Sequence, residues 1–129
     1  MYISPLERMK KIHLWIGTTT KKEAEYEKYF DPLNKDISQF GKDINVEEYD
    51  EDFIGIIPLF KQEVDLTDIL NEVPIDRMDI KLALDECARL KIEKANAVFY
   101  LTDASVEIQK PFKDNYNELK YIGMFNSDL

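Results

Sequence analysis

The chain has 129 residues, with 17 basic and 26 acidic side chains, a formal net charge of −9 and a sequence pI near 4.6. This length is typical of one domain, so we expect residues 1–129 to form a single domain, with residues 1–8 as a flexible N-terminal extension. The acidic balance argues against a nucleic acid ligand and the short apolar runs argue against a membrane span, while one cysteine and no signal-peptide core indicate a cytoplasmic protein.

The first predicted element is a strand over residues 11–17, where three aliphatic residues alternate with His13 and Trp15. Such alternation is typical of a half-buried strand. The clearest helix is predicted over residues 76–90, whose apolar side chains recur at helical spacing and include Cys87. In chain order, the predicted elements are a strand over 11–17, a helix over 21–30, a partly irregular polar segment over 33–52, a strand over 53–60, a short helix over 65–72, a helix over 76–90, and strands over 95–101, 106–112 and 118–125.

The arrangement of these elements predicts the fold class. The apolar run over 53–60 contains Pro58, which a strand tolerates at its end or at the edge of a sheet. The run over 95–101 is apolar almost throughout, which is typical of a central strand. The order of the elements predicts an α+β fold with a single small mixed or antiparallel sheet and helices packed on one face.

The excess negative charge is concentrated in one part of the sequence. Residues 43–72 hold ten acidic side chains and one basic one, Lys61, so this stretch carries −9 and the remainder is balanced. Its densest part combines five carboxylates with one aromatic ring: Glu47, Glu48, Tyr49, Asp50, Glu51 and Asp52. Aromatic rings beside charged groups are common at protein interfaces, so this segment is suited to a positively charged protein partner.

The acidic segment has three other interpretations besides a partner-binding surface. An EF-hand loop needs acidic ligands at alternate positions followed by glycine, whereas Asp52 is followed by Phe53 and Gly55 stands at the wrong place. Acid–base catalysis needs a defined carboxylate pair in a pocket, and the segment offers too many candidates. A solvated acidic loop without a function is an alternative that composition leaves open.

Three residue types occur once each and have both a functional and a structural interpretation. His13 has no recognisable nucleophile or base partner, and a surface or partly packed imidazole is its structural alternative. Cys87, on the apolar face of its helix, is favoured as a core residue over a nucleophile. Trp15 belongs either to the core, which is favoured, or to a partly exposed anchor for a partner, so we keep it as a candidate partner-binding residue.

No pattern in the sequence predicts a catalytic site. The four glycines are scattered, so no phosphate loop is predicted, and one histidine with one cysteine does not form a zinc site. We therefore predict a non-enzymatic protein with no catalytic residue, no metal and no cofactor. A small enzyme that uses His13 or a carboxylate cluster and a structural or adaptor protein are the alternative functions.

Two groups of segments resemble a known family. In the first group, KIHLWIGT (11–18) is followed by KEAEY (22–26) and YF (29–30). In the second, FGKDI (40–44) precedes YDEDF (49–53). Together they resemble the immunity 22 family of small bacterial proteins linked to polymorphic toxin systems. In that family a strand with tryptophan and glycine precedes a helix with Glu and Tyr-Phe, and an acidic block follows downstream.

The resemblance implies a cytoplasmic antidote that binds a cognate toxin domain, often encoded by a neighbouring gene, and blocks it without chemistry of its own. An acidic antidote fits a basic toxin, and charge alone, apart from the family, points to a nuclease because nucleases must hold phosphates. We therefore expect stoichiometric occlusion of the toxin through the acidic segment and no nucleic acid or membrane partner.

Overall fold

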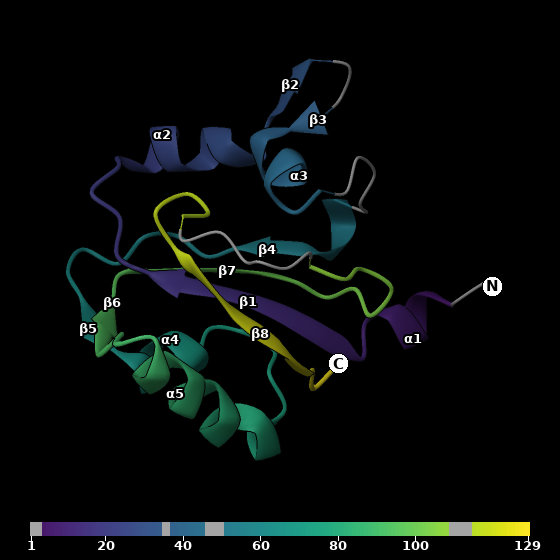
Figure 1. Cartoon of the computed structure of the whole chain (residues 1–129), viewed down its shortest axis with the longest axis vertical. Coiled ribbons are helices and arrows are strands. Elements are labelled where there is room, and N and C mark those ends of the chain that lie inside the picture. The colour runs from purple at the N-terminus through teal and green to yellow at the C-terminus, as the bar shows by residue number, and fades with distance from the viewer. Residues whose placement is uncertain (1–3, 35–36, 46–50, 109–114) are drawn as a thin grey trace.

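A computed structural model describes residues 4–34, 37–45, 51–108 and 115–129 (Figure 1). The helices and 3-10 turns of these residues are α1 (Pro5–Arg8), α2 (Glu23–Glu27), η1 (Lys28–Phe30), α3 (Gln39–Asp43), η2 (Glu51–Phe53), α4 (Leu66–Leu70), η3 (Arg77–Asp79) and α5 (Ile80–Arg89). The strands are β1 (Lys11–Gly17), β2 (Pro32–Asn34), β3 (Ile37–Ser38), β4 (Ile54–Ile56), β5 (Val64–Asp65), β6 (Lys94–Ala95), β7 (Ala97–Leu101) and β8 (Lys120–Asn126).

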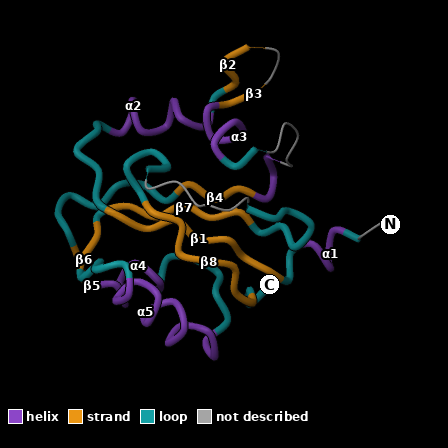
Figure 2. Tube along the Cα trace, in the orientation of Figure 1, coloured by secondary structure: helices purple, strands orange, loops and turns teal. Residues whose placement is uncertain are grey.

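An antiparallel sheet in the order β4-β7-β1-β8 runs through the middle of the molecule (Figure 1, Figure 2). β1 lies between β7 and β8, and His13 sits opposite Leu101 on one side and Met124 on the other. Two further strand pairs, β2-β3 and β5-β6, lie outside this sheet. The α+β class and the central position of the 95–101 strand are therefore confirmed.

β1 has the predicted bounds but a different environment. The sequence predicted a half-buried strand, whereas every side chain from Ile12 to Gly17 is buried. Alternation still assigns the two faces, because Ile12 and Leu14 join an aliphatic cluster while Trp15 joins an aromatic one. Trp15 is fully buried, so its assignment as a partner-binding residue is corrected and the core alternative is the observed one.

The aromatic cluster lies between the sheet and the layer formed by α2, η1 and α3 (Figure 1). Trp15 stacks on Phe99 with their ring centroids 4.9 Å apart. Phe99 also meets Phe30 edge to face at 4.9 Å and Phe40 at 5.5 Å, geometries that aromatic rings prefer. The indole N–H of Trp15 and the hydroxyl of Tyr26 are buried without a hydrogen-bond partner among the described residues.

The aliphatic cluster lies on the opposite face of the sheet, under α4 and α5 (Figure 1). α5 buries Ala83 and Cys87, which are four residues apart and therefore lie on the same side of the helix. Cys87 is fully buried, as predicted, and its burial, with a smaller effect of Glu86, raises the pKa of the thiol to about 11. A thiol of this kind behaves as a small hydrophobic side chain.

The helices therefore cover both faces of the sheet, and the predicted placement on one face is corrected. The sequence suggested that only one face of β1 is buried, because His13 and Trp15 alternate with the aliphatic residues and their amphipathic side chains are compatible with an exposed face. A helix that was not predicted, α3, contributes to the second layer: the Ser38 hydroxyl accepts a hydrogen bond from the Gly41 N–H (3.0 Å), and Phe40 and Ile44 are buried.

Several local signals were interpreted correctly, and one was not. The helical segment after β1 ends at Phe30, just before Asp31-Pro32, and β4 is an edge strand that ends before Pro58. Residues 106–108 of the strand predicted over 106–112 do not form a strand, and 109–112 lie outside the described residues. No helix of the described residues has the length and hydrophobicity that a membrane crossing requires.

Replacing Phe99 by alanine should lower the free energy of unfolding by about 3–5 kcal/mol, because it removes a fully buried ring from the centre of the aromatic cluster. Urea denaturation, monitored by far-UV circular dichroism, measures the change in the free energy of unfolding. Met78→Ala is the control, since that side chain is 85% exposed and its loss should alter the free energy of unfolding by no more than about 0.5 kcal/mol. Equal effects of the two substitutions would contradict the assigned core.

Candidate partner-binding surface

The structure describes only the end of the predicted acidic segment. Glu47, Glu48, Tyr49 and Asp50 lie outside the described residues. Glu51 begins η2, and the Asp52 side chain is exposed. The role of the segment in binding therefore stays a prediction, while its point of attachment to the fold is defined.

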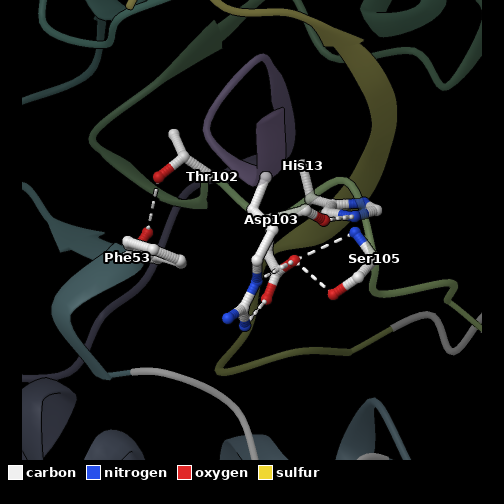
Figure 3. Close-up of polar contacts among 6 residues, drawn as sticks. His13, Phe53, Thr102, Asp103 and Ser105 are labelled. Carbon is white, nitrogen blue, oxygen red and sulfur yellow. Dashed lines mark hydrogen bonds and ion pairs between the residues drawn. The ribbon is translucent and has the colours of Figure 1, made fainter. Parts of the chain in front are cut away.

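Phe53 fixes the end of the acidic segment to the sheet (Figure 3). Its carbonyl oxygen accepts hydrogen bonds from the Thr102 N–H (2.9 Å) and from the Thr102 hydroxyl (3.1 Å). The Arg8 guanidinium lies 5.0 Å from the centre of the Phe53 ring, which is a cation–π distance. The exposed Asp52 is thus directly followed in the sequence by Phe53, whose carbonyl and ring are both held in place.

Asp103 is a buried carboxylate that holds Arg8 in this position. The side chain of Asp103 is 1% exposed, and its two oxygens accept hydrogen bonds from the Arg8 guanidinium at 2.7 and 3.2 Å. One of these oxygens also accepts from the Ser105 N–H (2.9 Å) and hydroxyl (2.5 Å), as Figure 3 shows. Burial alone would raise the pKa of Asp103, but the hydrogen bonds from Arg8 and Ser105 and the charge of Arg8 lower it below its usual value.

His13 is buried next to this group, more completely than the surface or partly packed imidazole that was its structural alternative. Its Nε2 lies 3.2 Å from the Asp103 carbonyl oxygen, and its Nδ1 lies 2.8 Å from the Tyr121 hydroxyl. A carbonyl only accepts, so the hydrogen-bond pattern assigns the proton to Nε2, and the Tyr121 hydroxyl donates to Nδ1. Burial lowers the pKa of His13, against the opposing effect of its hydrogen bonds and of Asp103. The imidazole is therefore a neutral structural group.

The described part of the acidic stretch includes a second group of carboxylates, on and beside α4. Asp65, Asp68 and Glu72 are exposed: Asp65 directly precedes α4, Asp68 lies within it, and Glu72 follows its C-terminal end. Ion pairs among the described residues join Arg8 with Asp103, Lys81 with Asp85, and Arg89 with Glu86. None of them includes an α4 carboxylate, so this negative charge is not compensated within the described fold.

The comparisons with known proteins now identify the family. The chain matches the family model described as Immunity protein 22 over residues 12–128. It belongs to the immunity protein 22 family. The resemblance seen in the first half of the sequence is thereby confirmed, and the match extends through the second half, from β1 to the end of the sheet. No curated protein and no solved structure matches the chain.

The Arg8–Asp103 pair is a feature of this immunity protein that sequence analysis missed. Arg8 precedes the matched region and lies in the stretch that was expected to be an extension, and 95 residues separate it from Asp103. No local pattern relates two residues at such a separation. The polar pair Thr102-Asp103 directly after a buried strand was the available signal.

The free energy of unfolding of this immunity protein should fall as the pH drops below about 6.5, because the unfolded chain takes up a proton on His13 that the native imidazole resists. Histidine is the side chain whose ordinary pKa lies in this range, and His13 is the single one in the chain. Denaturation between about pH 7.5 and pH 5.5 measures the slope. The His13→Gln variant should have a lower free energy of unfolding at every pH in this range, but that free energy should depend less on pH. Equal slopes for the two proteins would refute the assignment of the pH dependence to His13.

Arg8→Met should lower the free energy of unfolding by about 3 kcal/mol near neutral pH, because it leaves the Asp103 carboxylate buried without its cation. The loss should shrink below about pH 4, since the stabilisation from a lowered carboxyl pKa is present above the unfolded value and is lost as the carboxyl is protonated. Lys81→Met is the control, because the exposed Lys81–Asp85 pair should contribute no more than about 0.5 kcal/mol. A pH-independent loss would contradict this account.

Proposed function

We propose that this protein neutralises a bacterial toxin by binding a basic surface of it in a stoichiometric complex, without chemistry of its own. The family match supports an immunity role, and the segregation of charge supports the binding mode. Ten acidic side chains and one basic one fall within residues 43–72, and the rest of the chain is balanced. The segment of Glu47, Glu48, Tyr49, Asp50, Glu51 and Asp52 is the proposed contact.

The physical basis of the proposal is electrostatic. A concentration of carboxylates attracts a basic partner over a distance comparable with the Debye length, which is about 8 Å at physiological salt. Such attraction raises association rates up to about 10⁸–10⁹ M⁻¹s⁻¹ at low salt. Charge pairs that become buried in the complex contribute to selectivity, because a partner without the matching cation would leave carboxylates desolvated and unpaired.

A nuclease is the toxin class that this charge favours. Nucleases hold phosphates with lysine and arginine, and carboxylates laid over such a cleft would occupy the phosphate positions. The neutralising complex would then form in the cytoplasm, before the toxin reaches nucleic acid. Each of these steps follows from charge and is part of the proposal.

The alternative of an enzyme centred on His13 has no support in the geometry. His13 and Trp15 are both buried, so neither side chain can meet a substrate in this structure. The hydrogen bonds of His13 also occupy both ring nitrogens. We therefore retain the binding function.

Reversing the charge of the segment, with Glu48→Lys, Asp50→Lys and Asp52→Lys, should abolish neutralisation of the toxin encoded by the neighbouring gene. Growth rescue on co-expression and binding across a salt series are the measurements, and binding by the unsubstituted protein should weaken as salt rises. The matched control reverses three exposed carboxylates elsewhere, Glu25, Glu27 and Asp31, with the same change in net charge.

Loss of rescue with the segment variant and rescue with the control would support the proposal. Rescue by a folded segment variant would overturn the proposed contact. Loss of rescue with both variants would show that net charge alone acts, and not this surface.

A further inference from the structure

β4 forms one edge of the principal sheet, and β7 is its only partner among the described strands (Figure 2). The Phe53 carbonyl accepts a hydrogen bond from the Thr102 N–H (2.9 Å). Since hydrogen bonding alternates along an antiparallel strand, Phe53 and Gly55 turn their backbone groups toward β7. Ile54 and Ile56 turn theirs away from the sheet, and these N–H and C=O groups have no hydrogen-bond partner in the described part of the chain.

The opposite edge of the sheet, β8, is covered at its C-terminal end. The Asn126 N–H donates to the Asp79 carboxylate (2.7 Å), and the Asn126 carbonyl accepts from the Asp76 N–H (2.9 Å). The pairing of β8 with β1 also contains a register shift, next to Gly123 with its positive φ of 146°. Covering segments and bulges are two ways in which edge strands are kept from pairing with another chain. The pairing of β4 with β7 has no register shift, and no described segment covers its outward groups.

A groove of about 400 Å³ lies beside β4 and combines apolar walls with carboxylates. Ile54, Val73 and Tyr100 are among its apolar and aromatic residues, and Asp52 and Glu72 are its acidic ones. Such a combination suits a long side chain with an apolar stem and a cationic end, which describes lysine and arginine.

The aromatic wall of the groove depends on a glycine. Tyr100 lies opposite Gly55 in the sheet, and a Cβ at Gly55 would come within 2.0 Å of the Tyr100 ring. The ring therefore lies across the backbone of β4, where any other residue would displace it. If another strand paired with β4, its side chains on this face of the sheet would lie next to the Tyr100 ring.

The charge around the groove selects the partner. Glu72 is one of three exposed carboxylates on and beside α4, with Asp65 and Asp68, and none of the three takes part in an ion pair of the described residues. The guanidinium of Arg8 lies over the Phe53 ring and is already bound by the Asp103 carboxylate. The residues that line the groove thus include two carboxylates, Asp52 and Glu72, and no lysine or arginine among the described residues.

We propose that an extended basic segment of the toxin adds to the open edge of β4 as a further strand and places a lysine or arginine side chain in the groove between Asp52 and Glu72. Main-chain hydrogen bonds to Ile54 and Ile56 hold the segment, and the groove selects its basic side chain. This rests on the proposed function and specifies how the toxin is held.

Amide hydrogen exchange tests the strand pairing directly, on the full chain alone and with the toxin domain encoded by the neighbouring gene. The Ile54 and Ile56 amides should exchange readily in the free protein and slow at least about tenfold in the complex. The Gly55 amide faces β7 and should be protected in both states. A tight complex without added protection at Ile54 and Ile56 would overturn the proposal.

A pair of variants separates the backbone from the side chain at the edge. Ile56→Pro removes an outward N–H that makes no bond in the described fold, whereas Ile56→Ala removes most of the same side chain and keeps the N–H. Proline should weaken binding by about tenfold or more relative to alanine. Equal affinities of the two folded variants would overturn the strand pairing.

A second pair tests the groove. Asp52→Asn with Glu72→Gln should weaken binding and reduce its salt dependence, while Glu25→Gln with Glu27→Gln changes the net charge equally at exposed residues outside the groove. Equal effects of the two pairs would overturn the groove as the selective element. Failure of the unsubstituted protein to bind would instead overturn the proposed function itself, so the two failures are distinguishable.

Discussion

Burial of β1 on both faces is the constraint from which the polar interior of this protein follows. A strand enclosed between two layers and two neighbouring strands has no route to water, so its polar side chains must find partners inside. His13 does so by donating to the Asp103 carbonyl and accepting from Tyr121. The adjacent Asp103 carboxylate is itself buried, and Arg8 supplies the compensating charge.

That chain of contacts reaches the surface at Phe53. Arg8, held by Asp103, lies over the Phe53 ring, and Thr102 holds the Phe53 carbonyl. The acidic residues that precede Phe53 in the sequence are thus connected to the most deeply buried strand through a small number of polar contacts. The fold holds the end of the segment in place while the charges of Asp52 and of the α4 carboxylates remain exposed.

Elements that depend on local pattern could be predicted, and those that depend on distant partners could not. β1 and α5 were found because alternation and helical spacing are visible within a few residues. The short helix α3 was missed since its buried residue Phe40 and the buried Ile44 directly after it stand in a polar segment. The charge that marks the candidate surface was visible in composition, whereas the Arg8–Asp103 pair joins residues that only the folded chain brings together.

The buried and the exposed positions on either side of Phe53 in this immunity protein differ in how freely they can be substituted. Buried positions tolerate few substitutions, because a change in the packed core lowers the free energy of unfolding of the whole fold. Exposed positions such as Asp68 carry no packing contacts of that kind, and substitutions there leave stability nearly unchanged. Substitutions at such exposed positions can therefore accumulate one at a time while the folded scaffold persists.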